Sequence, residues 1–191
     1  LGWTAVPFSE EDGGLGGTPA DTMVFMQHLA GGLVVEPYLA NVALAGGILS
    51  RTADARQKEQ WLQPIIGGEL HATLAFNEPQ ARFDLADVAT TATRDGDDWL
   101  LNGEKAWITN AGVAGYFVVM AKTDPEAGKR GISAFIVPAD SPGLSVGVPE
   151  DKLGLRASRT APPPLRGMCM NSSVGWSAGR IGATSARCSR R

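Results

Sequence analysis

This sequence has little of the chemistry that metal sites, disulfide frameworks and nucleic-acid binding require. It contains two cysteines and two histidines in 191 residues. Cys169 and Cys188 lack C-x-x-C spacing, so they predict no disulfide framework. His28 and His71 each stand alone, without a second ligand at metal-binding spacing. A net charge of −3 at pH 7 argues against nucleic-acid binding as a main function.

Long apolar runs and a secretory signal are also missing. Residues 38–49 are interrupted by Asn41 and paired glycines, so no segment is long enough to cross a bilayer. The first residues lack a basic, apolar and small-residue signal pattern, and we therefore expect a cytoplasmic location. The first residue is Leu1 rather than Met, which predicts that the sequence begins within a longer protein.

Acidic residues are absent from the end of the chain. Residues 159–191 contain six arginines and both cysteines but no Asp or Glu, whereas residues 1–158 carry 11 basic and 20 acidic residues. The segment lacks strand alternation and helical periodicity, and three prolines stand at 162–164. This break predicts an aberrant, disordered tail over 159–191 that does not pack onto the body, and a shifted reading frame would explain it.

Residues 1–68 have the signals of a partial helical domain. Thr18 is a candidate N-cap, Pro19 suits the first helical position and Asp21 completes a capping box. Helical spacing gives one apolar stripe, which predicts core packing for Met23, Met26, Ala30 and Leu33. A second helix is expected over 36–49, and a third after residue 52 that ends before Pro64.

From His71 onward the period changes from helical to alternating. Strands are expected at 72–77, 87–94, 99–109, 116–123, 131–138 and 144–148. Residues 95–98 predict a hairpin turn, and Asn102-Gly103 predicts a second, type I′ turn. The sequence therefore predicts an α+β fold, in which an N-terminal helical segment is followed by a mostly antiparallel β-barrel or sandwich domain over 69–158.

One motif is more specific than any hairpin requires. The run Asn102–Asn110, NGEKAWITN, resembles the G-x-K-x-W-I-T-N signature of the acyl-CoA dehydrogenases, flavoenzymes that desaturate acyl-CoA thioesters. Further matching segments occur in the same order, namely the glycine-rich loop at 7–17, the helix-to-linker segment at 53–70, AFNEP at 75–79, FVVMAKTD at 117–124, GISAFIVP at 131–138, PGLSVG at 142–147 and KLGLRAS at 152–158.

The resemblance implies a cofactor, FAD, and residues that contact it. In the family the Trp of the motif covers the flavin ring and the Thr hydroxyl bonds near the reactive nitrogen, which places these roles on Trp107 and Thr109. Phe76 and Asn77 lie in the other flavin-facing segment, where Asn77 replaces a Thr and keeps a hydrogen-bonding side chain for the pyrimidine edge.

The sequence departs from the family at one functional loop. The usual T-E-P-x-A-G-S-D is replaced by residues 77–84, so the Gly and Ser become Arg82 and Phe83. These two are the candidate substrate-binding residues. Arg82 could pair with the carboxylate of a dicarboxylyl-CoA substrate, contact a cofactor phosphate, or remain a solvated loop residue.

The resemblance also implies the reaction and its partners. A carboxylate removes an α-proton while the β-hydride passes to the flavin, and electron-transfer flavoprotein is the expected acceptor in fatty acid metabolism. Intact relatives form homo- or hetero-oligomers. In the family the catalytic base lies in the C-terminal domain, so no residue is assigned as base and the chain alone is expected to be inactive. The alternative is a non-catalytic flavin- or acyl-CoA-binding or interaction protein on the same fold.

Overall fold

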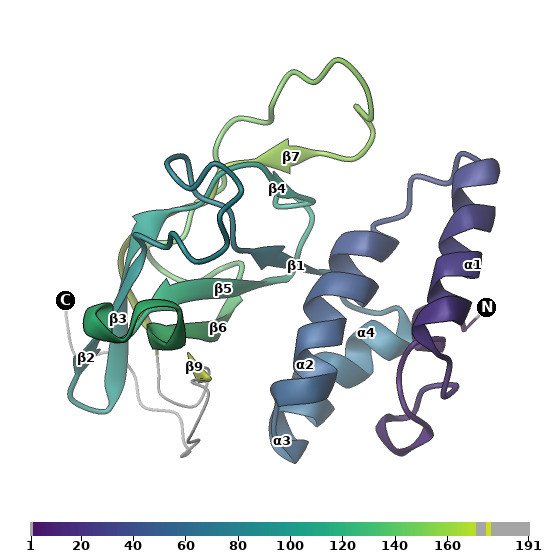
Figure 1. Ribbon diagram of the computed structural model, residues 1–191, viewed down its shortest axis with the longest axis horizontal. Coiled ribbons are helices and arrows are strands. Elements are labelled where there is room, and N and C mark those ends of the chain that lie inside the picture. The colour runs from purple at the N-terminus through teal and green to yellow at the C-terminus, as the bar shows by residue number, and fades with distance from the viewer. Residues whose placement is uncertain (1, 171–174, 177–191) are drawn as a thin grey trace.

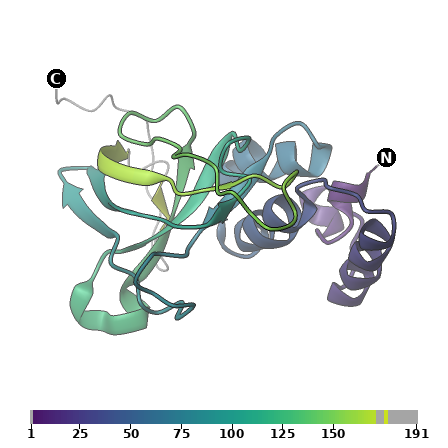
Figure 2. The ribbon, with the colours of Figure 1, turned by 90° about the horizontal axis from the view of Figure 1, so that it is seen from above.

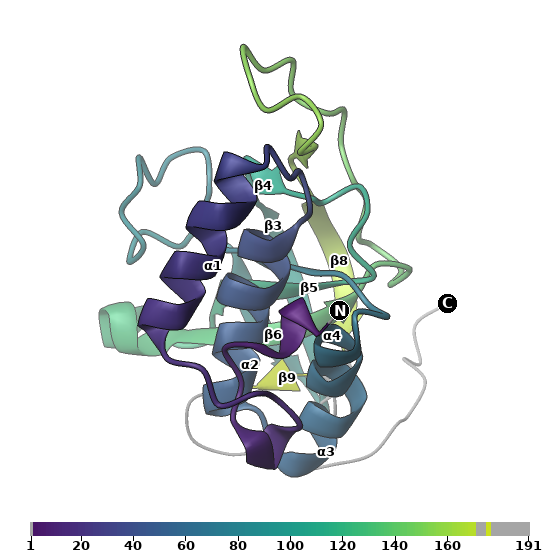
Figure 3. The same cartoon turned by 90° about the vertical axis from the view of Figure 1, so that its right-hand side faces the viewer.

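Helices and strands occupy opposite ends of the molecule. The computed structural model describes residues 2–170 and the backbone of 175–176. In Figure 1 the helices lie together at one end and the sheet at the other, and the view from above in Figure 2 shows the same division. Seen from the helical side, the helices lie in front of the sheet and cover one of its faces (Figure 3). The predicted α+β class is confirmed.

The helical part consists of one separate helix and two longer helical runs. After the short turns η1 (Trp3–Ala5) and η2 (Glu10–Asp12) comes α1 (Pro19–Gly31). The first run joins η3 (Leu39–Gly46), which has π-type turns, to α2 (Gly47–Thr52). The second joins α3 (Ala55–Gln57), the π-type η4 (Lys58–Leu62) and α4 (Gln63–Gly67).

The start of α1 is as predicted, but two other helical predictions are wrong. Thr18 and Asp21 form the capping box, in which Asp21 accepts from the Thr18 amide at 2.8 Å. The second run does not end before Pro64, because helical residues continue without a break from Ala55 to Gly67. Proline lacks the N–H of a regular α-helical ladder, and the π-type turns of η4 stand immediately before it. The predicted apolar stripe does not enter the core: Met23 and Leu33 are 57% and 85% exposed, Ala30 is exposed, and Met26 is only partly buried.

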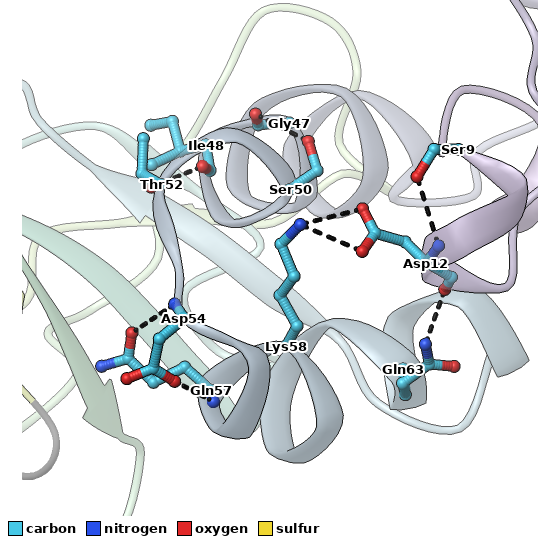
Figure 4. Close-up of polar contacts among 10 residues, drawn as sticks. All are labelled: Ser9, Asp12, Gly47, Ile48, Ser50, Thr52, Asp54, Gln57, Lys58 and Gln63. Atoms are coloured by element: carbon cyan, nitrogen blue, oxygen red, sulfur yellow. Dashed lines mark hydrogen bonds and ion pairs between the residues drawn. The ribbon is translucent and has the colours of Figure 1, made fainter. Parts of the chain in front are cut away.

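The loop before α1 is fastened to the second helical run by polar contacts (Figure 4). Lys58 Nζ lies 3.0 and 3.1 Å from the two carboxylate oxygens of Asp12. Gln63 donates its side-chain N–H to the Asp12 carbonyl at 2.6 Å, and the Asp12 amide donates to Ser9 Oγ at 3.2 Å. These contacts hold the loop to a helix that lies more than 40 residues further along the chain.

The main sheet has seven strands and is mostly antiparallel, as predicted. Its order is β8-β3-β2-β5-β6-β9, with β1 added beside β5. The antiparallel strands are β2 (Thr91–Asp95), β3 (Asp98–Glu104), β5 (Tyr116–Lys122), β6 (Ile132–Pro138), β8 (Pro164–Met170) and β9 (Gly175–Trp176). Parallel pairing joins β1 (Ala72–Ala75) to β5 and, at one residue pair, β2 to β5. The 3-10 segment η5 (Pro125–Gly131) connects β5 to β6.

Both faces of the central strands are buried in apolar clusters. On β5, Tyr116 and Val118 pack toward the helices with Leu62 and Ile65, while Phe117 and Val119 pack on the other side against β3 and β8. Successive side chains of a strand point to opposite faces, so β5 contributes alternately to the two clusters. A second, two-stranded sheet pairs β4 (Ile108–Thr109) with β7 (Thr160–Ala161).

One predicted turn is present and the other is not. Residues 95–98 form the hairpin between β2 and β3, as predicted. The type I′ turn at Asn102-Gly103 is wrong, because both residues lie inside β3. Gly103 is required there for a different reason. A Cβ at this position would lie 2.4 Å from Thr90 Oγ1, so only glycine allows the close approach of these segments.

The prediction that residues from 159 onward do not pack is wrong for residues 160–170. These residues form β7 and β8, and Ala161, Leu165 and Met168 are at most 1% exposed. The register shifts between Leu101 and Gly103 on β3, and β8 carries Gly167 at φ 57° opposite this point. This bulge explains why β8 lacks alternation in the sequence. The predicted strand at 144–148 is reduced to a single bridge from Leu144 to Leu165. The rest of the predicted tail, apart from the backbone of 175–176, lies outside the described residues.

Candidate functional site

The motif segment ends in the short strand β4, with one exposed side chain just before the strand and one on it. Trp107 has a left-handed backbone (φ 54°) and is 47% exposed, Ile108 is 1% exposed and Thr109 is exposed. Ile108 pairs with Ala161 on β7 and turns its side chain into the core. The exposed Trp107 and Thr109 therefore stand on either side of a buried residue, with an indole and a hydroxyl open to a ligand.

The second predicted flavin segment lies directly beside the first. Phe76 follows β1 and is half-buried, and Asn77 is 9% exposed. The Ala106 amide donates to the Asn77 carbonyl at 2.9 Å, which joins residue 77 to the neighbour of Trp107. In addition, Thr73 Oγ1 donates to the Thr109 carbonyl at 2.7 Å. The fold thus brings the segment of Phe76 and Asn77 next to the segment of Trp107 and Thr109, about 30 residues further along the chain.

The two predicted substrate residues lie on an open loop. Arg82 and Phe83 have left-handed backbones, with φ of 45° and 71°, which is unfavourable for consecutive residues that are not glycine. Phe83 is 82% exposed, and Arg82 is also exposed. Across residues 2–170 the Arg82 guanidinium makes no ion pair or hydrogen bond, so it is available to an anionic group.

Beneath these segments lies a buried ion pair. Lys105 Nζ is 2.5 Å from Glu78 Oε1, and the two side chains are 0% and 1% exposed. The carboxylate also accepts from the amides of Ala89 at 2.7 Å and Thr90 at 3.1 Å, and from Gln80 Nε2 at 2.8 Å. Glu78 is therefore a structural acceptor at the base of the loop.

The surroundings act on both members of this pair in a definite direction. Burial raises the pKa of Glu78, but hydrogen bonds from Lys105, Thr90 and Gln80 outweigh it and bring the pKa to about 2. Burial lowers the pKa of Lys105, and Glu78 opposes that effect. The sequence does not predict Lys105 as a site residue. The available signal was the lysine inside the motif that follows β3, since a lysine that is buried needs an acidic partner.

The described residues contain neither a metal-binding cluster nor a helix that could span a membrane. Within residues 2–170 no group of three or more His, Cys, Asp or Glu side chains is placed to hold a metal ion. His28 and His71 are both exposed and apart. None of the helices in the described part has the length and apolar character needed to span a membrane.

Comparison with known proteins identifies the two parts of the chain. Residues 1–69 match the family described as acyl-CoA dehydrogenase, N-terminal domain, and residues 73–167 match acyl-CoA dehydrogenase, middle domain. The second match extends through β7 and most of β8, consistent with their packing in the core.

Individual relatives agree with these matches. The chain is 40% identical over 163 residues to the mitochondrial short-chain specific acyl-CoA dehydrogenase of Bos taurus, covering 84% of this chain and 40% of that protein. It superposes on butyryl-CoA dehydrogenase from Megasphaera elsdenii with a TM-score of 0.85 and 31% identity, over 92% of this chain and 48% of the other. A glutaryl-CoA dehydrogenase from Mycobacterium smegmatis in complex with FADH2 gives a TM-score of 0.68 and 33% identity, over 74% and 36%.

These relatives are longer than this chain, which spans about 40% of the length of the curated short-chain enzyme it matches. The two domain matches follow one another without overlap and together account for the helical part and for the sheet as far as residue 167, within β8. By its sequence and its fold, this chain belongs to the acyl-CoA dehydrogenase family.

Proposed function

We propose that this chain supplies the flavin-facing segments of an FAD-dependent acyl-CoA dehydrogenase, which desaturates an acyl-CoA thioester between its α and β carbons. The observation that carries the proposal is the pair of exposed side chains at β4. Trp107, immediately before β4, is half-exposed, and Thr109 lies open on β4, beside Asn77 and Phe76. A large indole left open next to polar hydrogen-bonding groups is typical of a surface that binds a flat ligand.

The residues present fit FAD. Trp107 would stack on the flavin ring, the Thr109 hydroxyl would hydrogen-bond close to its reactive nitrogen, and the Asn77 amide would reach the pyrimidine edge. The Phe76 ring would provide an apolar contact to the flavin on the same surface. FAD, when bound, would take up the hydride that leaves the acyl group. The protein's part is to orient the ring and the thioester and to keep water away from them.

Arg82 and Phe83 are proposed to contact the substrate. The Arg82 guanidinium is exposed and has no ionic partner in the described chain. It suits the distal carboxylate of a dicarboxylyl-CoA, because arginine pairs with carboxylates through two parallel hydrogen bonds. One relative is a glutaryl-CoA dehydrogenase, an enzyme named for such a substrate. A cofactor phosphate contact and a solvated arginine remain the competing assignments.

No described residue is proposed as the catalytic base. Glu78 is the acid inside the flavin segment, and it is buried, ion-paired and turned toward the loop amides. We therefore expect the 191-residue chain alone to leave acyl-CoA unoxidised at an enzymatic rate, since positioned proton removal contributes about 10²–10⁴-fold. The same observation favours the second candidate, a non-catalytic flavin- or acyl-CoA-binding protein.

The family resemblance predicts electron-transfer flavoprotein as the electron acceptor and an oligomeric assembly. The sequence predicts a cytoplasmic location.

The test of the proposed function is FAD binding by the purified chain. The parent, the double variant Trp107→Ala/Thr109→Ala and the control Trp3→Ala are titrated with FAD while flavin fluorescence is recorded. Trp3 is a suitable control because it is 40% exposed but lies in the helical part. We expect the double variant to raise the Kd about tenfold or more and the control to leave it unchanged. An unchanged Kd in the double variant would refute the assignment.

The substrate assignment is tested separately on the FAD-loaded chain. Binding of glutaryl-CoA and butyryl-CoA is compared for the parent and for Arg82→Gly, which restores the residue usual in the family. We expect the parent to prefer glutaryl-CoA and the variant to lose that preference while binding butyryl-CoA at least as well. Equal affinity of the parent for the two thioesters would leave Arg82 without a role in recognising a carboxylate.

A further inference from the structure

The buried ion pair joins segments that are distant in the sequence. Lys105 immediately follows β3 and Glu78 lies in the loop after β1, and their charged atoms are 2.5 Å apart with almost no exposed surface. A buried charge is stable only when it is paired and its remaining hydrogen-bonding capacity is used. The four groups that donate to the Glu78 carboxylate meet this condition, namely Lys105, Gln80 and the amides of Ala89 and Thr90.

The same carboxylate closes the loop that carries the predicted substrate residues. Ala89 and Thr90 donate their backbone N–H groups to Glu78, so the two ends of the 79–88 loop are held together at one side chain. Thr90 is fully buried, and an amide at that depth needs an acceptor. Arg82 and Phe83 lie at the open part of this loop, in left-handed backbone conformations that are unfavourable for residues other than glycine.

The ion pair also lies next to the predicted flavin residues. Asn77 immediately precedes Glu78, and Trp107 follows Lys105 by two residues. In addition, the Ala106 amide donates to the Asn77 carbonyl at 2.9 Å. The two contacts together fix segment 76–78 against segment 105–107. A shift of Lys105 would therefore change the position of both the indole and the asparagine side chain.

We propose that Glu78 and Lys105 are positioning residues, which hold the two flavin-facing segments and the Arg82–Phe83 loop in register for FAD and the thioester. This inference rests on the proposed function, because the segments it orders are the ones assigned to those ligands. The low pKa of Glu78 agrees with this role, since the carboxylate keeps its charge and its acceptor capacity at neutral pH. Neither side chain reaches the ligand surface, so they act through Asn77, Arg82 and Trp107.

The test removes both charges together, because a single unpaired buried charge can unfold the protein. Glu78→Gln/Lys105→Met is compared with the parent chain and with Asp12→Asn/Lys58→Met, which removes the ion pair of the helical part. Three properties are measured, namely far-UV circular dichroism, hydrogen exchange of the Ala89, Thr90 and Ala106 amides without ligand, and FAD binding with the fluorescence of the bound flavin.

The positioning role predicts a folded variant whose site is loosened. In Glu78→Gln/Lys105→Met the three amides should exchange about tenfold faster or more, and the Kd for FAD should rise by a similar factor. The remaining bound flavin should fluoresce more like free FAD, because Trp107 no longer stacks on it in a fixed position. The control double variant should behave like the parent in all three measurements.

Two results would overturn the inference. One is a folded variant with parent-like exchange, and the other is faster exchange with unchanged FAD affinity and flavin fluorescence. If the charge-free variant does not fold, Glu78→Asp takes its place, since it keeps the charge but withdraws the carboxylate by one methylene from the two amides. A parent chain that binds no FAD would refute the proposed function for this chain, while the exchange of Ala89, Thr90 and Ala106 would still decide whether the pair orders these segments.

Discussion

The helical part and the β-part of this chain each contain an ion pair that fastens a loop, but the two pairs have different surroundings. Lys58 and Asp12 lie 3.0 Å apart at the edge of the helices, with 26% and 13% of their side chains exposed. Lys105 and Glu78 are 2.5 Å apart and fully enclosed. Water can replace a lost partner at the first pair but not at the second.

This difference follows from what each loop does. The loop at 9–14 covers the helices and has further bonds from Ser9 and Gln63, so its position does not depend on one contact. The Arg82–Phe83 loop has exposed apolar and charged residues at its open part and is tied at its base to Glu78. The loop of the predicted binding region thus depends on one buried carboxylate. The loop at 9–14 is held instead by several contacts, each of them partly exposed to water.

The largest effect is expected from breaking the buried pair on one side. Lys105→Met leaves the Glu78 carboxylate buried without its counter-charge, so the free energy of unfolding should fall by about 3–5 kcal/mol. Urea denaturation followed by circular dichroism measures this loss. The matched control is Glu78→Gln/Lys105→Met, which removes both charges and should recover much of the stability. A loss below about 1 kcal/mol in Lys105→Met would mean that the pair is not enclosed as described.

A similar but somewhat smaller loss is expected from the strand that the sequence did not predict. Leu165 on β8 is 1% exposed and packs in the cluster between β3 and β5, so Leu165→Ala should cost about 2–5 kcal/mol of unfolding free energy. Leu153 is fully exposed and serves as the control, with an expected change within about 0.5 kcal/mol. Equal effects of the two substitutions would argue against the packing of β8.

The contact between β3 and Thr90 should tolerate no added side chain. In Gly103→Ala the new Cβ would lie 2.4 Å from Thr90 Oγ1 and 2.7 Å from its Cα, so the strands must move apart, at a cost of about 1–3 kcal/mol. Thermal denaturation compares this variant with Gly112→Ala, where no atom lies within 4 Å of the added Cβ. Parent-like stability of Gly103→Ala would show that these strands are not in close contact.

Acid should weaken the β-part through Glu78. Its pKa of about 2 in the folded chain is below the ordinary glutamate value of 4.5, so its stabilising contribution is complete above pH 4.5 and is lost as the pH falls toward 2. Between pH 7 and pH 4 this group should account for about 1 kcal/mol. The difference in urea midpoint between the parent and Glu78→Gln/Lys105→Met should shrink over that range, and a constant difference would contradict a depressed pKa.

The smallest effect is expected at the partly exposed pair. Lys58→Met should change the free energy of unfolding by about 0–1 kcal/mol, because Asp12 can be solvated when its partner is removed. Urea denaturation of Lys58→Met beside Lys105→Met then measures the contrast between the two regions directly. If Lys58→Met proved as destabilising as Lys105→Met, burial would not be the cause of the difference.

Local signals in the sequence predicted much of the fold. The capping box at Thr18 and Asp21 and the turn at 95–98 depend on residues within a few positions of one another, and both are present. Alternation predicted β5 and β6 within one residue of their observed bounds, and the general α+β class followed from the order of the elements. The resemblance in the motif at 102–110 also placed the chain in its family, which the domain matches confirm.

The sequence by itself determined the elements whose signals are local and the family, and it predicted the candidate residues Phe76, Asn77, Trp107 and Thr109. Tertiary structure decided the features that depend on distant partners. The bulge at Gly167 exists because β8 pairs with β3, and Lys105 can be buried because Glu78 meets it from a loop 27 residues earlier. A lysine is stable without water only beside such a partner, and local sequence signals do not predict that contact.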